Sequence, residues 1–453
     1  TAAFATIVAG IVARDGLEGL MTATILAGVF LIIMGFCHFG SLIKFIPYTI
    51  TTGFTSGIAV SIVIGQLKDF CGITYPDGVK PIETMEKLKA FAENFSTISP
   101  DALIVGGVSL AILIVSPLIF KKIPGSLIAV IAGILMVQFL PLHVSTIGNL
   151  YTISNALPTL HLPVFDMKLI QSAIPNAFTI AVLAAIESLL SCVVADGMIN
   201  SKHRSDTELI AQGAGNIASA LFGGIPATGA IARTAANIKN GGRTPVAGMV
   251  HSITLVIVLV VLMPFAGMIP MPTIAAILFL VAYNMCQWRT FVHLVRTAPK
   301  SDIIVLFTTF VLTVVFDLVV AIEIGMVLAC LLFIKRMSEE THADSWVYVD
   351  DDSPAVDEHL QKLPLEIRVY EITGPLFFGA ADAIEHIVVK DFTKCLVLRM
   401  RSVPTIDSTA MNALQNLTKL CESKGITLVF SHVNEQPMKM MKKSGFVELV
   451  GEE

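Results

Sequence analysis

Charge is scarce in this chain of 453 residues: Asp, Glu, Lys and Arg together make up 14% of it, whereas hydrophobic residues make up 54%. No cluster of Lys and Arg forms a phosphate-binding stripe and the formal net charge is only −5, which argues against a nucleic-acid partner. The seven cysteines are scattered without a CxxC spacing, so they indicate neither a zinc site nor a disulfide framework. The sequence also lacks a nucleophile motif and a cofactor loop, so we expect no enzyme, no metal and no cofactor.

Long apolar runs take the place of the missing charge, and the mean hydropathy is +0.77. An apolar run of about 20 residues is long enough to cross a hydrocarbon core of roughly 30 Å as a helix. We therefore predict a multi-span α-helical membrane protein with about ten spanning helices and two short ones. The expected segments are 1–13 (short), 17–36, 46–66, 101–120, 124–141, 171–195, 208–224, 228–238 (short), 246–269, 272–288, 302–316 and 318–335.

Lys and Arg are unequally divided between the loops. With residue 336 placed in the cytoplasm, the loops on that side hold twelve of them and the opposite loops hold six, most of these in the long 67–100 loop. Positively charged loops stay in the cytoplasm, so we expect a cytoplasmic C-terminus. Residue 317 alone separates the last two segments, which predicts a tight hairpin near one membrane surface.

The composition changes after Arg336. Residues 338–357 are rich in Asp, Glu and Ser, which predicts an exposed linker. Beyond it, expected strands alternate with expected helices: strands at 365–372, 395–400 and 426–430, and helices at 380–388, 409–424 and 437–444. This alternation predicts a small α/β domain of about 95 residues. The expected division is a membrane transport domain at 1–337, the linker at 338–357 and the α/β domain at 358–453.

Two ionisable residues interrupt the apolar runs. Arg233 lies in Ala-Ile-Ala-Arg-Thr-Ala-Ala at 230–236, and Glu187 lies in Ala-Ile-Glu-Ser-Leu-Leu at 185–190. An ionised side chain near the middle of a bilayer costs roughly a few kcal/mol or more, so each residue is a site hypothesis. The plainer alternatives are that Arg233 snorkels to the interface or braces helices through carbonyl groups, and that Glu187 makes a hydrogen bond between helices.

The two short segments predict a binding site halfway across the membrane. Such segments start inside the bilayer, where unpaired N–H groups and the positive end of the helix dipole hold an anion. By the orientation above, one segment runs outward to Arg14 and the other inward to Lys239, so their N-termini face each other. Small residues allow the ligand to approach the backbone: Ala2, Ala3, Gly229, Ala230 and Ala232.

The membrane motifs and the tail together resemble the SulP family of anion transporters with a C-terminal STAS domain. The motifs are Thr1-Ala2-Ala3-Phe4, Thr52-Gly53-Phe54-Thr55-Ser56-Gly57, the strings around Glu187 and Arg233, and Asp407-Ser408-Thr409-Ala410 at the turn that looks like the STAS signature. The resemblance implies an inverted-repeat transporter of fourteen segments, a cytoplasmic α/β STAS domain and a homodimer. Twelve segments are expected here, without the family's first two. The chain also starts without an initiator Met or a signal sequence, so we expect it to begin inside a larger protein.

The expected function is secondary active transport of a small anion by alternating access in the bacterial inner membrane. The resemblance is nearest to the C4-dicarboxylate branch, which favours succinate or fumarate, whereas the residues suit sulfate or bicarbonate equally. Glu187 is expected to balance Arg233 in the empty site and to couple transport to protons, with sodium as the alternative ion. An anion channel and a membrane scaffold for a STAS-binding partner stay open as alternatives. The expected substrate-binding residues are Thr1, Ala2, Ala3, Phe4, Glu187, Gly229, Ala230, Ile231, Ala232, Arg233 and Thr234.

Ser408 is the candidate regulatory residue, because relatives of the STAS fold can be phosphorylated at the corresponding helix start. A phosphate there would be stabilised by the helix dipole. Helix capping by Asp407 or Ser408 is the simpler interpretation. We therefore expect a regulatory or docking domain without catalysis of its own, with a cytoplasmic protein as its partner.

Overall fold

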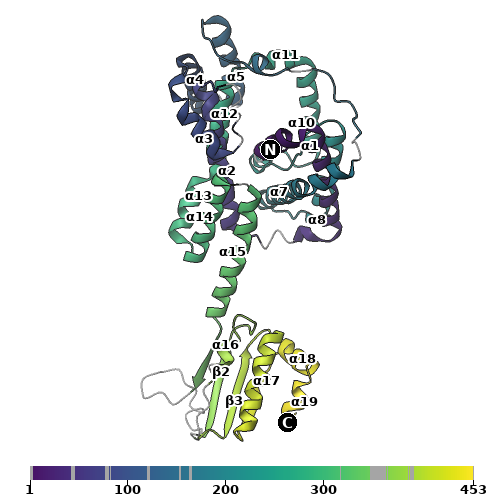
Figure 1. Cartoon of the computed structure of the whole chain (residues 1–453), viewed down its shortest axis with the longest axis vertical. Helices are drawn as coiled ribbons and strands as arrows, with labels where there is room; N and C mark the ends of the chain where they lie inside the picture. The colour runs from purple at the N-terminus through teal and green to yellow at the C-terminus, as the bar shows by residue number, and fades with distance from the viewer. Residues whose placement is uncertain are drawn as a thin grey trace. The chain divides into compact units, whose positions relative to one another are not determined.

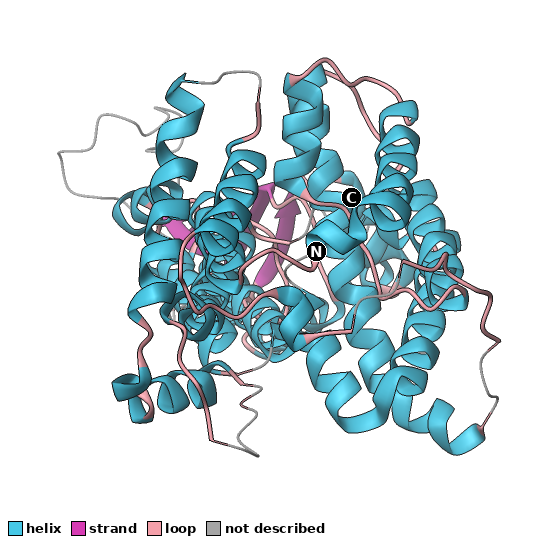
Figure 2. Ribbon diagram, turned by 90° about the horizontal axis from the view of Figure 1, so that it is seen from above, coloured by secondary structure: helices cyan, strands magenta, loops and turns pink. Residues whose placement is uncertain are grey.

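The computed structural model describes residues 4–41, 46–76, 81, 83–119, 123–152, 155–162, 166–316, 318–346, 364, 366–385, 387 and 392–451. The chain divides into two compact units, residues 1–326 and residues 327–453. Figure 1 labels most of the helices of both units, and in Figure 2 the strands, in magenta, all belong to the second unit.

The described part of the first unit is helical. Its helices are α1 (Phe4–Phe36), α2 (Tyr48–Cys71), α3 (Thr84–Glu93), α4 (Pro100–Ile119), α5 (Gly125–Phe139), α6 (Ile147–Leu150), α7 (Met167–Ile199), α8 (Ser205–Leu221), α9 (Ile231–Lys239), α10 (Val246–Ile257), α11 (Met263–Ala266), α12 (Met271–Cys286), α13 (Trp288–Thr297), α14 (Lys300–Val315) and the start of α15 (Leu318–Glu339). Six stretches within the described residues are long and apolar enough to cross a membrane: Ile7–Phe36, Tyr48–Cys71, Pro100–Ile119, Met167–Ile199, Val246–Ala266 and Met271–Thr297.

The helices of this unit form two sets, which occupy different sides of the unit in Figure 1 and meet at a hydrophobic cluster with residues from α1, α2 and α7. In the α1 bundle, α1 packs on α7 and α8, and α9 packs on α7. In the α2 bundle, α2 packs on α12 and α14, and α4 packs on α12 and α5. Small residues bring the backbones together: a Cβ on Gly28 of α1 would lie 2.7 Å from the Gly213 carbonyl oxygen of α8. Such close approach is how helices associate in lipid, where burial of apolar surface contributes little.

Large apolar side chains point outward in this unit. Leu118, Phe139 and Phe265 are 78%, 78% and 59% exposed, whereas alanines such as Ala177 and Ala181 are fully buried. The stretch Val246–Ala266 has no buried residue in its apolar window. A protein in water would bury these large side chains, so this inverted distribution is typical of helices that face lipid.

The predicted break after the first short segment is confirmed. Gly16 has φ 71 and ψ −173, which divides α1 into a short arm at residues 4–15 and a long arm at residues 17–36. Such a left-handed φ favours glycine because it carries no Cβ. Most other spans lie within a few residues of their predicted bounds, although α7 extends four residues further at each end.

The prediction missed several helical features, and three of them concern the membrane helices. The α3 helix lies within the 67–100 loop and is too short and too polar to count as a span, whereas α13 follows α12 within the apolar stretch Met271–Thr297. The single helix expected at 246–269 is interrupted by a π-helical turn at Val258–Leu262. Pro264 explains the interruption, because a proline inside a helix removes an N–H donor and displaces the preceding turn. The predicted hairpin residue 317 lies outside the described residues.

The second unit contains a four-stranded sheet in the order β1 (His342–Trp346), β2 (Ile367–Thr373), β3 (Cys395–Ser402) and β4 (Thr427–Ser431). β1 is antiparallel to β2, whereas β2, β3 and β4 are parallel. The helices are α16 (Asp382–Glu385), α17 (Ser408–Ser423), α18 (Glu435–Lys443) and α19 (Phe446–Val450). Alternate residues of β3, Leu396, Leu398 and Met400, join Leu414 of α17 in the core, as expected for one covered sheet face.

The range predicted as a linker, 338–357, differs from the structure at its start. α15 continues to Glu339, and β1 occupies residues 342–346 and pairs with β2 from His342↔Thr373 to Trp346↔Val369. The sequence His-Ala-Asp-Ser-Trp does not alternate apolar and polar residues, so it gives no strand pattern, and the backbone pairing with β2 decides its structure. Residues 347–357 lie outside the described residues.

Candidate anion-binding site

The segment that leads into α9 is held by two amide side chains of α8. Asn216 is 1% exposed, and its Oδ1 accepts a hydrogen bond from the Ala227 N–H at 2.8 Å. Its Nδ2 donates to the Ala227 carbonyl oxygen at 2.9 Å, and Gln212 donates to the same oxygen. Both polar groups of the Ala227 backbone are thereby satisfied, so this segment has a defined position in front of α9.

One face of α7 receives the residues that follow. Thr228 Oγ1 donates to the Ala184 carbonyl oxygen at 2.9 Å, and Ser191 Oγ donates to Thr234 Oγ1 at 2.8 Å. Between these bonds, a Cβ on Gly229 would lie 3.1 Å from the Ser188 Cα. Glycine therefore allows the chain to cross α7 at close range.

Glu187 belongs to this same face of α7. It lies three residues after Ala184 and four residues before Ser191, which is the spacing of neighbours on a helix surface. Its side chain is partly buried. The structure therefore brings Gly229 and Thr234 onto the part of α7 that carries Glu187.

The N-terminus of α9 has no side-chain cap. Ala230 is the residue before the helix and makes no capping bond, and Ile231, Ala232 and Arg233 form the first turn. The first N–H groups of an α-helix have no partner inside the helix, so this end can bind an anion.

Arg233 is exposed on α9. Within the part of the chain that the structure describes, no hydrogen bond or ion pair reaches its guanidinium group, so the expected balance between Glu187 and Arg233 is not present as a direct pair. The charge of Arg233 lies at the first turn of α9, next to the uncapped N–H groups.

The predicted residues of the first short segment are only partly described. Thr1, Ala2 and Ala3 lie outside the described residues. Phe4 is 1% exposed and belongs to a hydrophobic cluster that also contains Phe54 of α2 and Leu183 of α7. It therefore anchors the inner end of the short arm.

Glu208 is a site residue that the sequence prediction missed. Ser188 Oγ of α7 donates a hydrogen bond of 2.6 Å to Glu208 Oε1 in the first turn of α8. Ser188 directly follows Glu187 in α7, so its hydrogen bond with Glu208 brings a second carboxylate close to Glu187. A signal exists in the sequence: Glu208, Gln212 and Asn216 follow one another at a spacing of four, so they form a polar stripe on α8.

A cavity of about 830 Å³ lies between the two bundles. Its walls come from the short arm of α1, from α7 and from the α2 bundle with α3 and α15. The lining residues are Ala5, Ile7, Gly10, Ile11, Ala13, Arg14, Ile58, Ser61, Ile62, Gly65, Gln66, Glu83, Thr84, Lys87, Asn176, Thr179, Leu278, Thr313, Val315, Phe316 and Val320. The cavity thus extends along the short arm from Ala5, near its inner end, to Arg14 at its outer end.

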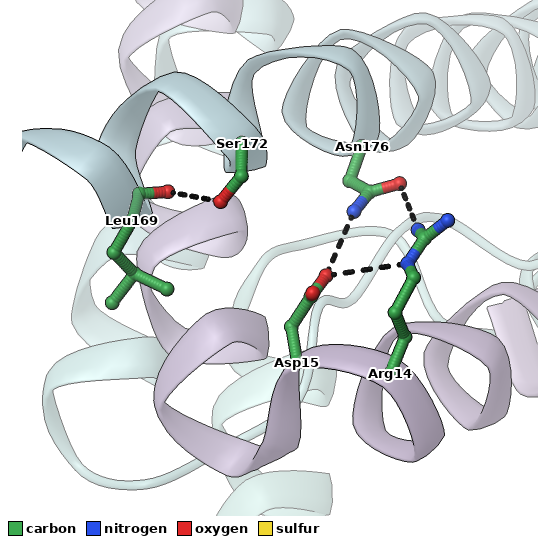
Figure 3. A network of polar contacts seen from close by, with 5 residues as sticks. All are labelled: Arg14, Asp15, Leu169, Ser172 and Asn176. Atoms are coloured by element: carbon green, nitrogen blue, oxygen red, sulfur yellow. Dashed lines mark hydrogen bonds and ion pairs between the residues drawn. The ribbon is translucent and has the colours of Figure 1, made fainter.

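A polar network ties the outer end of the short arm to α7 (Figure 3). Arg14 Nη2 donates to Asn176 Oδ1 at 3.1 Å, and Arg14 Nε lies 3.5 Å from Asp15 Oδ2. Asn176 Nδ2 donates to the same Asp15 oxygen at 3.4 Å. The charge of Arg14 is therefore balanced by its neighbour, and both side chains are oriented by α7.

At the candidate regulatory position in the second unit, the helix cap is Asp407. Its Oδ1 accepts from the Ala410 N–H at 2.9 Å, and its Oδ2 accepts from the Phe378 N–H at 2.8 Å. Ser408 is the exposed first residue of α17. Phosphorylation of Ser408 stays a prediction.

Comparison with known proteins gives matches over nearly the whole chain. Residues 1–309 match the Sulfate permease family, and residues 361–452 match the STAS domain. The chain is 36% identical to "Putative sulfate transporter YvdB" of Bacillus subtilis, over 100% of this chain and 84% of that protein. It is 31% identical to "Bicarbonate transporter BicA" of Synechocystis, over 96% of this chain and 78% of that protein.

Two solved structures are similar in fold. "The overall structure of SLC26A9" matches with a TM-score of 0.82 at 19% identity, covering 97% of this chain and 73% of that chain. "The transmembrane domain of a cyanobacterium bicarbonate transporter BicA" matches with a TM-score of 0.61 at 30% identity, covering 72% and 81%. The predicted architecture, a multi-span helical domain followed by a STAS domain, is confirmed.

Proposed function

Because the chain belongs to the sulfate permease family of anion transporters, we propose that it carries a small oxyanion across the membrane by alternating access. The predicted family and its STAS domain are confirmed, and the matched relatives are transporters, so the prediction that this protein is not an enzyme is confirmed as well. The observation that carries the proposal is the position of α9: its uncapped N-terminus starts on the Glu187 face of α7, where Gly229 permits close contact.

The substrate that we propose is sulfate or bicarbonate. The reported relatives are named for these two anions, which supports them ahead of the C4-dicarboxylates. Both are compact oxyanions whose oxygens accept hydrogen bonds from backbone N–H groups and a guanidinium group, as the first turn of α9 offers. Transport of succinate or fumarate stays a prediction, and the assay therefore includes succinate beside sulfate and bicarbonate.

Alternating access is supported by the division of the first unit into two bundles. Glycine contacts hold each bundle together internally, such as Gly28 against Gly213 in one and Gly53 against the Leu306 carbonyl oxygen in the other. The large cavity lies between the bundles. A relative movement of two such bundles would close this cavity and open the site to the opposite side.

We propose Glu187 as the group that couples transport to a cation. It shares the α7 face with Ser191, and Gly229 packs on this helix at Ser188, next to the start of α9. A proton on Glu187 would remove a negative charge beside the anion, whereas a sodium ion would compensate that charge. Either event makes anion binding more favourable, so the transport assay applies a proton gradient and a sodium gradient separately.

We further propose a place in the bacterial inner membrane with the C-terminus in the cytoplasm. The excess of Lys and Arg in the loops on that side supports this orientation. Homodimer formation and a cytoplasmic protein partner for the STAS domain are carried forward as proposals, each supported by the resemblance alone.

The test is uptake by purified protein in proteoliposomes. Labelled sulfate, bicarbonate and succinate are each offered with an inward proton gradient, an inward sodium gradient or neither. We expect uptake of sulfate or bicarbonate that one gradient accelerates, and we expect Glu187→Gln to lose this acceleration. Uptake of none of the three anions would refute the proposal, and normal acceleration in Glu187→Gln would refute the coupling role. Ion currents far above carrier rates would favour a channel.

A further inference from the structure

We propose a second anion-binding site at the outer end of the cavity, in which Lys87 of α3 and Ser61 of α2 hold a small oxyanion on its way to α9. "Outer" here means the side of the membrane on which α3 lies. The inference rests on the proposed function, because it identifies where the transported anion first binds.

Lys87 reaches from α3 over α2 into the cavity. The α3 helix packs on α2 and α14, and Lys87 lines the cavity. A Cβ on Gly65 would lie 4.0 Å from the Lys87 Nζ, so the ammonium group lies over the bare backbone of α2. Burial lowers the pKa of Lys87, with the neighbouring Glu86 acting in the opposite direction. The ammonium group is therefore partly withdrawn from water.

The carboxylates near Lys87 are directed elsewhere. Glu83 also lines the cavity, but it forms a capping box with Glu86 at the start of α3, in which each side chain accepts from the backbone N–H of the other. No ion pair joins Lys87 to any residue that the structure describes. The other cation in the lining, Arg14, is balanced by Asp15 and held by Asn176 (Figure 3). Lys87 is thus the lining cation with charge left for a ligand.

Ser61 supplies a second, independent observation. Its hydroxyl oxygen is buried and has no hydrogen-bond partner among the described residues, and the residue lines the same cavity. Buried hydroxyl groups are normally paired, and another χ1 rotamer of Ser61 would turn this O–H toward an anion in the cavity. Ser61 precedes Gly65 by four residues, so it lies one helical turn, or about 6 Å, further along α2 than the Lys87 ammonium group.

The arrangement forms a path for an anion. Lys87 lies near the outer end, Ser61 lies one turn deeper, and Ile58 lies three residues beyond Ser61 in the same lining as Ala5 of the short arm. A lysine is a compact, strongly hydrated charge that attracts oxyanions without the fixed geometry of an arginine fork. Such a site captures sulfate or bicarbonate weakly and releases it inward, as an entry site must.

The experiment compares Lys87→Ala with Lys89→Ala. Lys89 is on the same helix, is exposed and pairs with Glu93 at 3.9 Å, so its removal changes the net charge equally without affecting the cavity. Initial uptake of labelled sulfate and of labelled bicarbonate is measured in proteoliposomes at low and at high ionic strength. For Lys87→Ala we expect KM to rise about fivefold at 0.01 M salt and less than twofold at 1 M salt, where the Debye length falls from about 30 Å to about 3 Å. The maximal rate is retained, Lys87→Arg restores KM, and Ser61→Ala raises KM without salt dependence.

A second measurement does not depend on transport. An amine-reactive reagent labels the protein with and without sulfate or bicarbonate, and mass spectrometry reads the labelling of both lysines. We expect either anion to slow the labelling of Lys87 at least threefold relative to Lys89. Equal KM values for Lys87→Ala and Lys89→Ala at low salt, or equal protection of both lysines, would overturn the proposed site. Failure of the wild-type protein to move any anion, with Lys87 still protected, would refute the transport function and leave the site standing.

Discussion

Asn216 offers a direct test of how the start of α9 is positioned. Asn216→Ala removes two hydrogen bonds to Ala227, the one that satisfies its N–H at 2.8 Å and the one to its carbonyl oxygen at 2.9 Å. A neutral hydrogen bond contributes about 1 kcal/mol net, and Ala227 is itself exposed, so water can replace the partners that its backbone loses. The carbonyl also keeps Gln212 as a donor. We therefore expect a loss of about 1–2 kcal/mol, concentrated in the segment before α9.

The consequence for transport follows from the same numbers. A loss of about 1.4 kcal/mol shifts a two-state equilibrium about tenfold, so the disordered form of this segment gains population by about that factor. Uptake by Asn216→Ala is then expected to fall severalfold, up to about tenfold, while protein yield and helical content remain near those of the wild type. Asn216→Asp is expected to be at least as harmful, because its second oxygen would face the Gln212 and Ala227 carbonyl oxygens that now accept from Nδ2.

Gln212→Ala is the matched control for this prediction. It lies one turn earlier on α8 and removes only a second donor to the same carbonyl oxygen, so it is expected to cost about 1 kcal/mol or less. The measurements are initial uptake rates in proteoliposomes and hydrogen exchange of residues 225–230 in the whole chain. The reasoning is refuted if both variants transport equally well, or if exchange in this segment is unchanged in Asn216→Ala.

Two further predictions concern the second unit. Asp407→Ala removes the acceptor of two backbone N–H groups and is expected to destabilise the start of α17 by about 1–2 kcal/mol, whereas Ser408→Ala has little effect. Faster hydrogen exchange in the first turn of α17 measures this, and equal exchange in both variants would contradict it. Burial raises the pKa of the Cys421 thiol, with Lys424 acting in the opposite direction, so less thiolate is present at pH 8. Iodoacetamide is expected to alkylate Cys421 about tenfold more slowly than an exposed thiol introduced by Ser423→Cys, and comparable rates would refute the reasoning.

The membrane spans could be predicted because hydropathy acts along the chain. A run of apolar residues is sufficient to predict a helix in lipid, since every backbone group must then be paired within the segment. The break at Gly16 was predicted for a similar local reason, because Arg14, Asp15 and Gly16 interrupt an apolar run. The α3 helix gave no such signal, although it carries Lys87.

The residues of the site were predicted unequally. Glu187 and Gly229 stood out, one as a carboxylate in an apolar run and the other as a small residue before a short helix. Glu208 looked like an acidic residue at an ordinary helix start, and only its 2.6 Å bond with Ser188 places it at the site. Strand β1 was missed because its structure depends on pairing with β2 rather than on its own residues.

The sequence by itself determined that this chain is a membrane protein with two short segments, a carboxylate and an arginine in apolar surroundings, and a separate α/β domain. These properties depend on neighbours in the chain, where local hydropathy and helix spacing act. The tertiary structure alone decided that Asn216 holds Ala227, that Ser191 meets Thr234, and that Lys87 lies over Gly65. These pairs depend on how helices that are distant in sequence pack, and packing is decided by contacts between side chains that no local pattern encodes.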